Sequence, residues 1–411
     1  MNRRAKAGIW IRILIIGFLF MFGLVGSAYA EKPVYAIGNI ANLTGIYAPG
    51  MRGTHEGFLD AVDAANREGK LPVELKSVWV DGASSPAKAL SACKKMVSQH
   101  NPVVIIDGTT PSSLAIKGYV LKKKIPALSG GGADPLWALP SYSFSAIAPY
   151  QNQVGAWVDY YLKHLWPKKG LKRTPNFAWL TWDNAAGRAS ITPKVKEYIK
   201  SKGVNIMPGD GEFVPVAPTE LSARMLRLKK NKVDFTYGLL LHPTAAAVLK
   251  GMGKMGMIDE IDTHFILPNP VGLVNQAGPL CRNTYSADYV WNGNDWPEKS
   301  PRIIEVFNRN DREKQKFRKT MYAVGFSWGL ITIEAVRMAA QDVGANNVTG
   351  EACYKALTRL KNFKRWGLGP KITYGEKKRY ALDSICYFRL NDSRINTVGE
   401  FPTPNLTKFE F

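Results

Sequence analysis

Residues 102–113 read PVVIIDGTTPSS, and this stretch decides the fold class. The apolar run at 102–106 is short and continuous, which is typical of a strand that is buried on both faces. Asp107 and Gly108 end the run. Hydroxyl residues and a proline then lead into a helical pattern over 113–123, and such residues favour a helix start. A buried strand followed at once by a helix is the repeating unit of a parallel sheet.

The same alternation continues on both sides of this stretch. Strands are expected at 34–40, 73–80 and 125–128, and a second series is expected at 176–182, 204–207, 233–240 and 264–267, with helices between them. The segment 143–153 reads as a crossing between the two series. Beyond residue 280 the pattern predicts a strand at 285–291, helices at 301–307, 322–341 and 350–360, and C-terminal strands that include 385–390. These elements predict an α/β protein with two doubly wound, mainly parallel sheets.

The first thirty residues have the pattern of a cleavable signal peptide. Four basic residues come first, an apolar run follows, and the segment ends in Ala28-Tyr29-Ala30. The apolar run is short for a membrane span, although an uncleaved anchor is the alternative reading. No cysteine follows the cleavage site, and no other stretch reads as long and apolar enough to span a bilayer. We therefore expect export of a free protein into a Gram-negative periplasm.

The chain is strongly basic, with 55 Lys and Arg residues against 33 Asp and Glu residues. Without the leader, 51 basic and 33 acidic residues leave a net charge of +18. An excess of this size can indicate nucleic acid, an anionic membrane or an anionic ligand. The basic residues are scattered in short clusters without an aromatic platform, so a solvated basic surface is the preferred interpretation and no nucleic-acid partner is expected.

Cysteine and histidine spacing predicts neither a metal site nor a redox motif. Export permits disulfides among Cys93, Cys281, Cys353 and Cys386, but four cysteines allow three pairings. A single bridge between Cys353 and Cys386 is the pairing suggested here. The sequence contains no C-x-x-C and no paired metal-ligand spacing, and we expect no metal, no cofactor and no catalytic residue.

Small and hydroxyl residues follow three of the expected strands. The loops are 43–50, 107–113 and 129–134, and the last two place free backbone N–H groups at helix starts. Helix N-termini suit a carboxylate or another anion. Capping by Thr and Ser explains each loop taken singly. Three such loops at neighbouring strand ends favour a ligand site, because open α/β sheets bind ligands beyond the carboxyl ends of their strands.

The order of these motifs resembles the family of periplasmic substrate-binding proteins of the branched-chain amino acid receptor type. The resemblance rests mainly on these stretches: LTG at 43–45 with Gly57, AVDAAN at 61–66, the turn at 108–113, IPALS at 125–129, WDNAAG at 182–187 and GLGP at 367–370. The resemblance covers essentially the whole chain after the leader. It implies a type I periplasmic-binding fold whose two lobes, joined by three crossings, close on a small ligand. We expect lobe boundaries at 31–149 with 281–360, and at 150–280 with 361–411.

The resemblance also places the ligand site. In such proteins hydroxyl and backbone groups of the first lobe hold a ligand carboxylate, and aromatic and acidic residues of the second lobe complete the site. The resulting candidates are Tyr47, Thr109, Thr110, Ser112, Gly131, Ala133, Tyr150, Asn184, Ala186, His242 and Asn269. Trp182 and Tyr322 are further candidates for the lining.

Four candidate positions depart from the family pattern. Ala186 and His242 stand where aromatic residues are usual, Ala133 replaces a hydroxyl residue, and Asn269 replaces the acidic residue that binds a ligand ammonium. Without that carboxylate a buried ammonium has no partner to offset its desolvation. A neutral amide or an organic acid, in particular an aromatic one, is therefore expected rather than a plain amino acid.

The sequence thus predicts a non-enzymatic solute receptor that delivers its ligand to an inner-membrane ABC permease. Two alternatives stay open. One is a ligand-sensing subunit of the same fold that regulates a partner protein, and the other is a secreted enzyme. Genes for a permease and an ATPase beside this one would favour transport, and turnover of a substrate would favour the enzyme.

Overall fold

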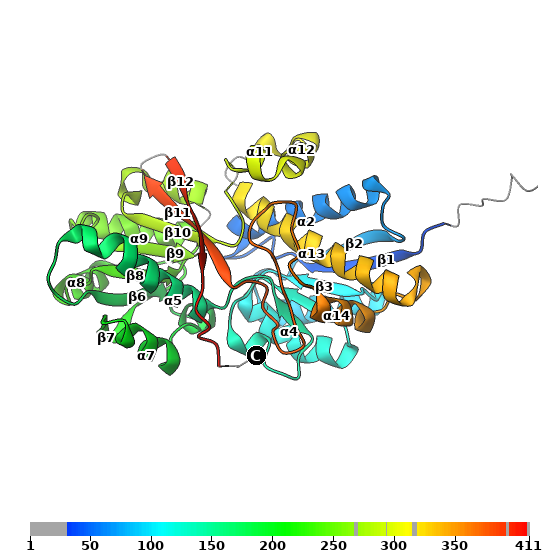
Figure 1. Cartoon of the computed structure of the whole chain (residues 1–411), viewed down its shortest axis with the longest axis horizontal. Helices are drawn as coiled ribbons and strands as arrows, with labels where there is room; N and C mark the ends of the chain where they lie inside the picture. The colour runs from blue at the N-terminus through cyan, green and yellow to red at the C-terminus, as the bar shows by residue number, and fades with distance from the viewer. Residues whose placement is uncertain (1–30, 267–269, 293, 315–318, 392–393, 409–411) are drawn as a thin grey trace, which may run out of the picture. The chain divides into compact units, whose positions relative to one another are not determined.

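The computed structural model describes residues 31–408, except 267–269, 293, 315–318 and 392–393. The predicted leader lies outside the described residues. The remaining chain builds two separate sheets with helices packed on them (Figure 1). The α/β class with parallel sheets is confirmed.

The first sheet has five parallel strands in the order β2-β1-β3-β4-β5. They span Val34–Ile40 (β1), Glu74–Val80 (β2), Val104–Asp107 (β3), Ala127–Ser129 (β4) and Ser143–Ser145 (β5). Three helices alternate with these strands: Ala48–Glu68 (α2), Pro86–His100 (α3) and Thr110–Lys123 (α4). β3 is buried at every position, as its continuous apolar sequence predicts.

The second sheet has seven strands in the order β12-β11-β10-β9-β8-β6-β7. Five are parallel: Asn176–Trp182 (β6), Asn205–Val214 (β7), Phe235–Leu239 (β8), Asp262–Ile266 (β9) and Thr284–Asp288 (β10). The C-terminal strand Ser384–Asn391 (β11) pairs antiparallel with β10, and Arg394–Pro402 (β12) pairs antiparallel with β11. The helices of this half are Tyr150–Tyr160 (α5), Ala185–Arg188 (α6), Pro193–Ser201 (α7), Ser222–Lys230 (α8), His242–Lys254 (α9) and Pro270–Ala277 (α10).

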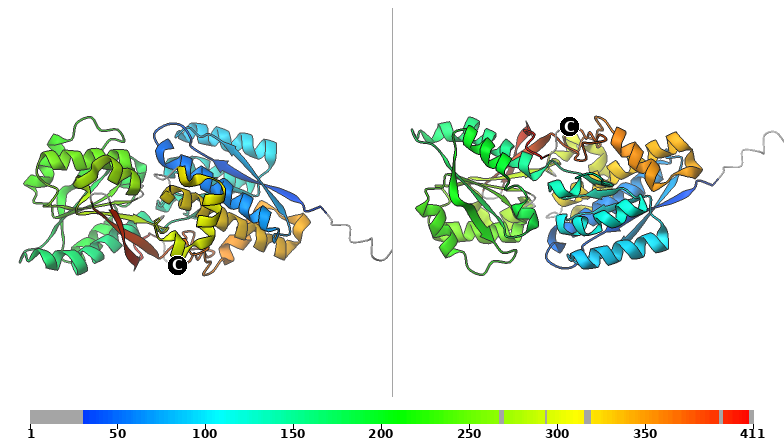
Figure 2. Two further views of the ribbon diagram at one scale, coloured as in Figure 1. Left: turned by 90° about the horizontal axis from the view of Figure 1, so that it is seen from above. Right: turned by 90° about the horizontal axis from the view of Figure 1, so that it is seen from below.

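The chain returns to the first sheet between β10 and β11. It forms the helices Trp296–Lys299 (α11), Pro301–Arg309 (α12), Lys319–Val343 (α13) and Gly350–Arg359 (α14). Both views in Figure 2 show α13 and α14, in gold and orange, beside the blue and cyan elements of the first sheet. By length and composition α13 could span a membrane, so the expectation that no stretch beyond the leader qualifies is wrong. Most of α13 is buried against α2, which explains its apolar sequence.

Two glycines let α13 approach α2 closely. A Cβ atom on Gly325 would lie 1.7 Å from the carbonyl oxygen of Thr54, and one on Gly57 would lie 2.0 Å from that of Tyr322. Both neighbours are backbone atoms of the partner helix, which cannot move aside as a side chain could. Only glycine fits these two positions.

Sheet membership differs from the predicted lobe boundaries at two places. Residues 284–288 pair with β9 and β11 in the second sheet, although the segment 281–360 was expected with the first lobe. Conversely, Tyr380 forms a bridge with Ser145 of β5, and the Tyr374 hydroxyl donates to the carbonyl of Ser145 at 2.9 Å. This part of 361–411 therefore packs on the first sheet. Strand pairing with distant segments decides both placements, and residue order alone carries no such information.

The cysteine pair suggested by the sequence does not form. Cys353 and Cys386 are buried free thiols. Cys353 lies on α14 beside the first sheet, whereas Cys386 lies on β11 of the second sheet, where it pairs with Asp288. Burial raises the pKa of Cys353 to about 12, so the thiol stays protonated.

Candidate ligand-binding cleft

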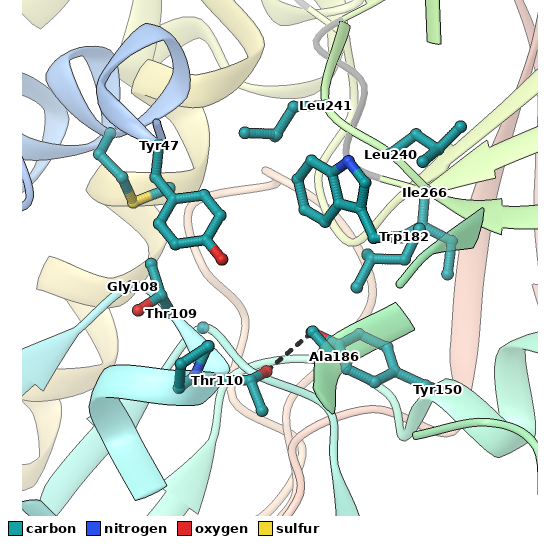
Figure 3. Close-up of a pocket in the computed structure, with 14 residues that line it drawn as sticks. Tyr47, Gly108, Thr109, Thr110, Tyr150, Trp182, Ala186, Leu240, Leu241 and Ile266 are labelled. Carbon is teal, nitrogen blue, oxygen red and sulfur yellow. Dashed lines mark hydrogen bonds between the residues drawn. The ribbon is translucent and has the colours of Figure 1, made fainter. Parts of the chain in front are cut away.

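A pocket lies where the carboxyl ends of strands from both sheets meet. It holds about 470 Å³ of space outside protein atoms, part of it open to solvent. The lining comes from the last residues of β6, β8 and β9, from the loops after β1, β3, β4 and β8, and from the first turns of α2, α4, α5 and α6 (Figure 3). The lining residues are Tyr47, Met51, Gly108, Thr109, Thr110, Pro111, Gly130, Tyr150, Trp182, Ala186, Leu239, Leu240, Leu241 and Ile266.

A buried polar network fixes the two loops on the first-sheet side. Asp107, the last residue of β3, accepts hydrogen bonds from Asn42 Nδ2 at 3.2 Å and from Ser113 Oγ at 2.6 Å. Ser129 at the end of β4 donates to Ser113 Oγ at 2.7 Å and accepts from the Gly131 N–H at 2.9 Å. These buried hydrogen bonds therefore hold together the two loops that carry Thr109 and Gly130.

Asp107 is desolvated by this arrangement. Burial raises the pKa of its carboxyl to about 7, and the hydrogen bonds from Ser113, Asn42 and the backbone only partly oppose the shift. The side chain does not line the pocket. Its role in the site is to position the backbone at 108–113.

Trp328 of α13 packs against both of these loops and leaves little room for a side chain at Gly130 or Gly108. A Cβ atom on Gly130 would lie 2.5 Å from Cη2 of Trp328, and one on Gly108 would lie 2.5 Å from Sδ of Met51 and 3.3 Å from Cη2 of Trp328. The backbone can therefore approach both the helix and the pocket, as close ligand contact requires.

Three hydroxyl groups form the polar end of the pocket (Figure 3). The Thr110 hydroxyl lies 3.1 Å from the Tyr150 hydroxyl. The Thr109 side chain is only 7% exposed, and its Oγ1 has no partner among the described residues. Both threonines stand at the N-terminus of α4, where the helix dipole and the first N–H groups favour a negatively charged or strongly polar atom. An unpartnered buried hydroxyl at this place is suited to a ligand acceptor.

Two aromatic rings and a row of aliphatic side chains form the rest of the wall. The rings of Tyr47 and Trp182 face one another from the two sheets, with centroids 6.0 Å apart and an angle of 55° between their planes (Figure 3). Trp182 Nε1 donates to Thr244 Oγ1 at 3.1 Å, which fixes the indole. Leu239, Leu240, Leu241 and Ile266 complete this side.

No charged side chain lines the pocket among the described residues. A ligand ammonium would find no carboxylate there, and a ligand carboxylate would find only hydroxyl and backbone donors. The arrangement can hold a flat or aliphatic body between Tyr47, Trp182 and the leucines, with one polar group at the α4 N-terminus. It offers no nucleophile with a general base beside it, and the described residues contain no cluster of metal ligands.

The structure brings five of the eleven predicted residues into the lining: Tyr47, Thr109, Thr110, Tyr150 and Ala186. Five others do not line it. Asn184 caps α6 by accepting from the N–H groups of Ala186 and Gly187 at 3.0 and 2.9 Å. Gly131 lies behind Thr110 and donates to Ser129.

The remaining predicted residues lie around the pocket or outside the described part of the chain. Ser112 is buried within the first turn of α4, Ala133 belongs to the core, and His242 starts α9 with its Nδ1 buried and without a hydrogen-bond partner. Burial lowers the pKa of His242, so the imidazole is neutral at physiological pH. Asn269 lies outside the described residues.

Of the two further candidates, Trp182 lines the pocket and Tyr322 does not. The Tyr322 hydroxyl donates to Asp60 at 2.8 Å within the core beside α2. Met51, Gly108, Pro111, Gly130, the three leucines and Ile266 were not predicted. Leu239 and Leu240 end the strand expected at 233–240 and Leu241 follows it, so their position at its carboxyl end was a usable signal, but an apolar run reads first as core.

Comparison with known proteins agrees with this architecture. The family model described as periplasmic binding protein matches residues 34–391. No curated protein matches the chain in sequence. Among solved structures, a branched-chain amino acid ABC transporter protein from Thermus thermophilus with bound valine is 18% identical, covering 92% of this chain and 97% of the other, with a TM-score of 0.79.

Two further solved structures carry different ligand descriptions. A solute-binding protein of an ABC transporter from Rhodopseudomonas palustris in complex with p-hydroxybenzoic acid is 15% identical (90% of this chain, 98% of the other, TM-score 0.74). A fatty acid ABC transporter substrate-binding protein from Thermomonospora curvata is 17% identical (92% and 95%, TM-score 0.75). At these identities the structures establish a common fold, and the family model extends over most of the sequence. The chain therefore belongs to the periplasmic binding protein family.

Proposed function

We propose that this protein is an exported solute receptor that captures an organic carboxylic acid or amide, in particular an aromatic one, and delivers it to an inner-membrane ABC permease. The observation that carries the proposal is the uncharged pocket, whose polar side-chain groups include the hydroxyls of Tyr47, Thr110 and Tyr150 and whose remaining walls are largely apolar (Figure 3). A carboxyl or amide group fits beside Thr109 and Thr110 at the α4 N-terminus. An aromatic ring can pack beside the Tyr47 and Trp182 rings, where offset or edge contacts are favourable.

The same pocket disfavours a plain amino acid. The α-ammonium would be buried against leucine and tryptophan side chains without an acidic partner in the described lining. The neighbours named above bind ligands of both kinds, valine in one case and p-hydroxybenzoic acid in another. The polarity of this chain's own lining favours the second kind.

A thermal-shift and calorimetry screen tests the proposal. The panel is benzoate, 4-hydroxybenzoate, benzamide, octanoate, leucine and valine, because a ligand that binds only the folded state raises the melting temperature. We expect saturable shifts with an aromatic acid or amide and none with leucine or valine. A saturable shift with leucine and none with the aromatic compounds would overturn the assignment of ligand class.

Variants of Thr110 locate the polar group of the ligand. Thr110→Val removes the hydroxyl and should weaken an acid ligand about tenfold or more, because a hydrogen bond to a charged group contributes about 1.5–3 kcal/mol. Thr110→Ser keeps the hydroxyl and should retain most of the affinity. Thr358→Val, on α14 far along the chain from the lining, controls for the substitution itself. Equal affinity of the valine and serine variants would place the polar group elsewhere.

A further inference from the structure

The amino ends of four parallel strands lie side by side in the second sheet, and they gather segments that are far apart in the sequence. Asn176 of β6 pairs with Asn205 of β7, and Phe235 of β8 pairs with Phe177 on one side and Asp262 on the other. Hydrogen bonds also join the loops themselves. Asn176 Nδ2 donates to the carbonyl of Lys232 at 2.9 Å.

These loops carry an exposed excess of positive charge. Seven lysines in or beside them are exposed and form no ion pair among the described residues. We call this set the basic end: Lys168, Lys172, Lys200, Lys229, Lys230, Lys232 and Lys254.

The acidic residues nearby do not neutralise the basic end. Asp234 and Asp262 are buried and already paired, with Arg173 at 2.6 Å and with Lys169 at 2.8 Å. Asp259 pairs with Arg282. Glu260 is exposed, and its backbone carbonyl accepts from Lys169. The seven lysines therefore outnumber the exposed carboxylates near them, which are Glu197 on α7, Glu220 near Lys254, and Glu260.

An apolar side chain stands within this surface. Leu171 is 46% exposed, directly before Lys172. Trp166 lies close by, with the guanidinium of Arg173 5.5 Å from its ring centroid. Leucine and tryptophan beside lysines are the residue types that enter the interfacial layer of a bilayer, with the lysine ammonium groups at the level of the phosphates.

We propose that the basic end binds the anionic phospholipid surface of the membrane. Lysines are flexible, hydrated point charges, which suit a diffuse field of phosphates better than a specific carboxylate partner. None of the seven lines the ligand pocket, and the pocket lies at the carboxyl ends of the same strands, so lipid contact leaves it accessible. This inference does not depend on the ligand class proposed above.

Vesicle co-sedimentation of the purified protein tests the proposal. The vesicles contain either phosphatidylcholine alone or about 30% phosphatidylglycerol, at about 50 mM and about 500 mM NaCl. We expect binding only to the phosphatidylglycerol vesicles and loss of binding at high salt. The Leu171→Ser variant should bind these vesicles more weakly than wild type.

A matched pair of charge variants distinguishes membrane binding by the basic end from a general effect of the protein's net charge. The first is Lys168→Gln, Lys172→Gln, Lys230→Gln and Lys232→Gln together. The second neutralises four exposed lysines beside the first sheet that also lack ion pairs, Lys76, Lys88, Lys94 and Lys95. We expect vesicle affinity to fall about tenfold or more in the first variant and to change less than about twofold in the second. Unchanged melting temperature and ligand-induced shift in both variants show that fold and pocket are intact.

Three outcomes would overturn the proposal. They are equal loss of vesicle binding in both variants, no vesicle binding by the wild type at low salt, and binding to soluble polyglutamate with none to the phosphatidylglycerol vesicles. The last outcome would point to an acidic protein partner. The ligand screen is independent of all three, so failure here would leave the proposed receptor function standing.

Discussion

At the scale of single residues, two buried carboxyl groups make stability depend on pH. Burial raises the pKa of both Asp107 and Asp288 to about 7. Asp107 keeps hydrogen-bond partners for both oxygens, whereas Asp288 accepts only from the Tyr289 N–H at 2.8 Å and leaves Oδ2 without a partner. The nearby charge of Arg365 lowers the pKa of Asp288 but does not cancel the effect of desolvation. Each residue therefore stabilises the fold more in its neutral form.

The sign of the pH effect of Asp288 follows from this shift. The folded-state pKa of Asp288 lies above the unfolded value of 3.8. The contribution of this side chain to the free energy of unfolding is therefore complete at low pH and is lost as pH rises from about 4 through about 7. Asp288→Asn cannot ionise, so its free energy of unfolding relative to wild type should improve by up to about 1.4 kcal/mol per pH unit across this window. Urea unfolding at several pH values measures the difference.

Comparison with wild type is essential in that experiment, because buried histidines act in the opposite direction. Burial lowers the pKa of His264 to about 3 and that of His55 to about 4, so their contributions are lost as pH falls. These residues are unchanged in the variant and cancel in the difference. A difference that does not vary with pH would contradict the assigned ionisation of Asp288.

At the scale of elements, the contact between α2 and α13 depends on glycine. A side chain on Gly57 or Gly325 would run into backbone oxygen atoms of the partner helix. The two helices would have to separate, and separation would disturb the first turn of α2, which carries Tyr47 and Met51 to the pocket.

We expect Gly57→Ala to lower the free energy of unfolding by about 2–3 kcal/mol, because overpacking against a fixed backbone costs about this much. Gly118→Ala is the matched control. Gly118 lies within α4, and its added Cβ would meet no atom within 4 Å. That variant should gain about 0.5–1 kcal/mol from helix propensity. Chemical denaturation of both proteins tests the pair, and equal effects of the two changes would show that the close helix contact is not what requires glycine.

At the scale of the whole molecule, a buried arginine joins segments that pass between the two sheets. Arg365 is fully buried and donates to Ser327 Oγ of α13 at 2.6 Å, to the carbonyl of Tyr289 at 2.9 Å and to that of Pro370 at 2.8 Å. Tyr289 directly follows β10, and Pro370 lies on the return path towards β11. One guanidinium thus ties together two crossings and a helix of the first half.

Arg365→Lys should lower the free energy of unfolding by about 3 kcal/mol. A lysine ammonium cannot reach three acceptors that a planar guanidinium serves at once, and each buried acceptor left unpaired costs about 1–3 kcal/mol. Arg67→Lys, at an exposed ion pair with Asp63, should cost less than about 1 kcal/mol. Differential scanning calorimetry of the two variants measures the contrast. A similar small loss in both would mean that Arg365 does not tie the crossings together.

The sequence by itself determined the fold class, the order of the elements and part of the pocket. Apolar runs such as 102–106 and helix starts such as Thr109 to Ser113 are local signals, and strand ends in a parallel sheet necessarily share one edge. Of the residues predicted in this way, Tyr47, Thr109, Thr110, Tyr150 and Ala186 line the pocket.

Only the tertiary structure decided which neighbours each of these residues has. The Asn184 side chain caps the N-terminus of α6, and Gly131 lies behind Thr110, so neither lines the pocket. The leucines at 239–241 form a wall of the pocket, although their sequence reads as core. The return of β10 to the second sheet and the burial of α13 likewise depend on pairing between segments far apart in the chain. Residue spacing fixes local conformation, whereas packing between distant segments sets which side chains reach a common space.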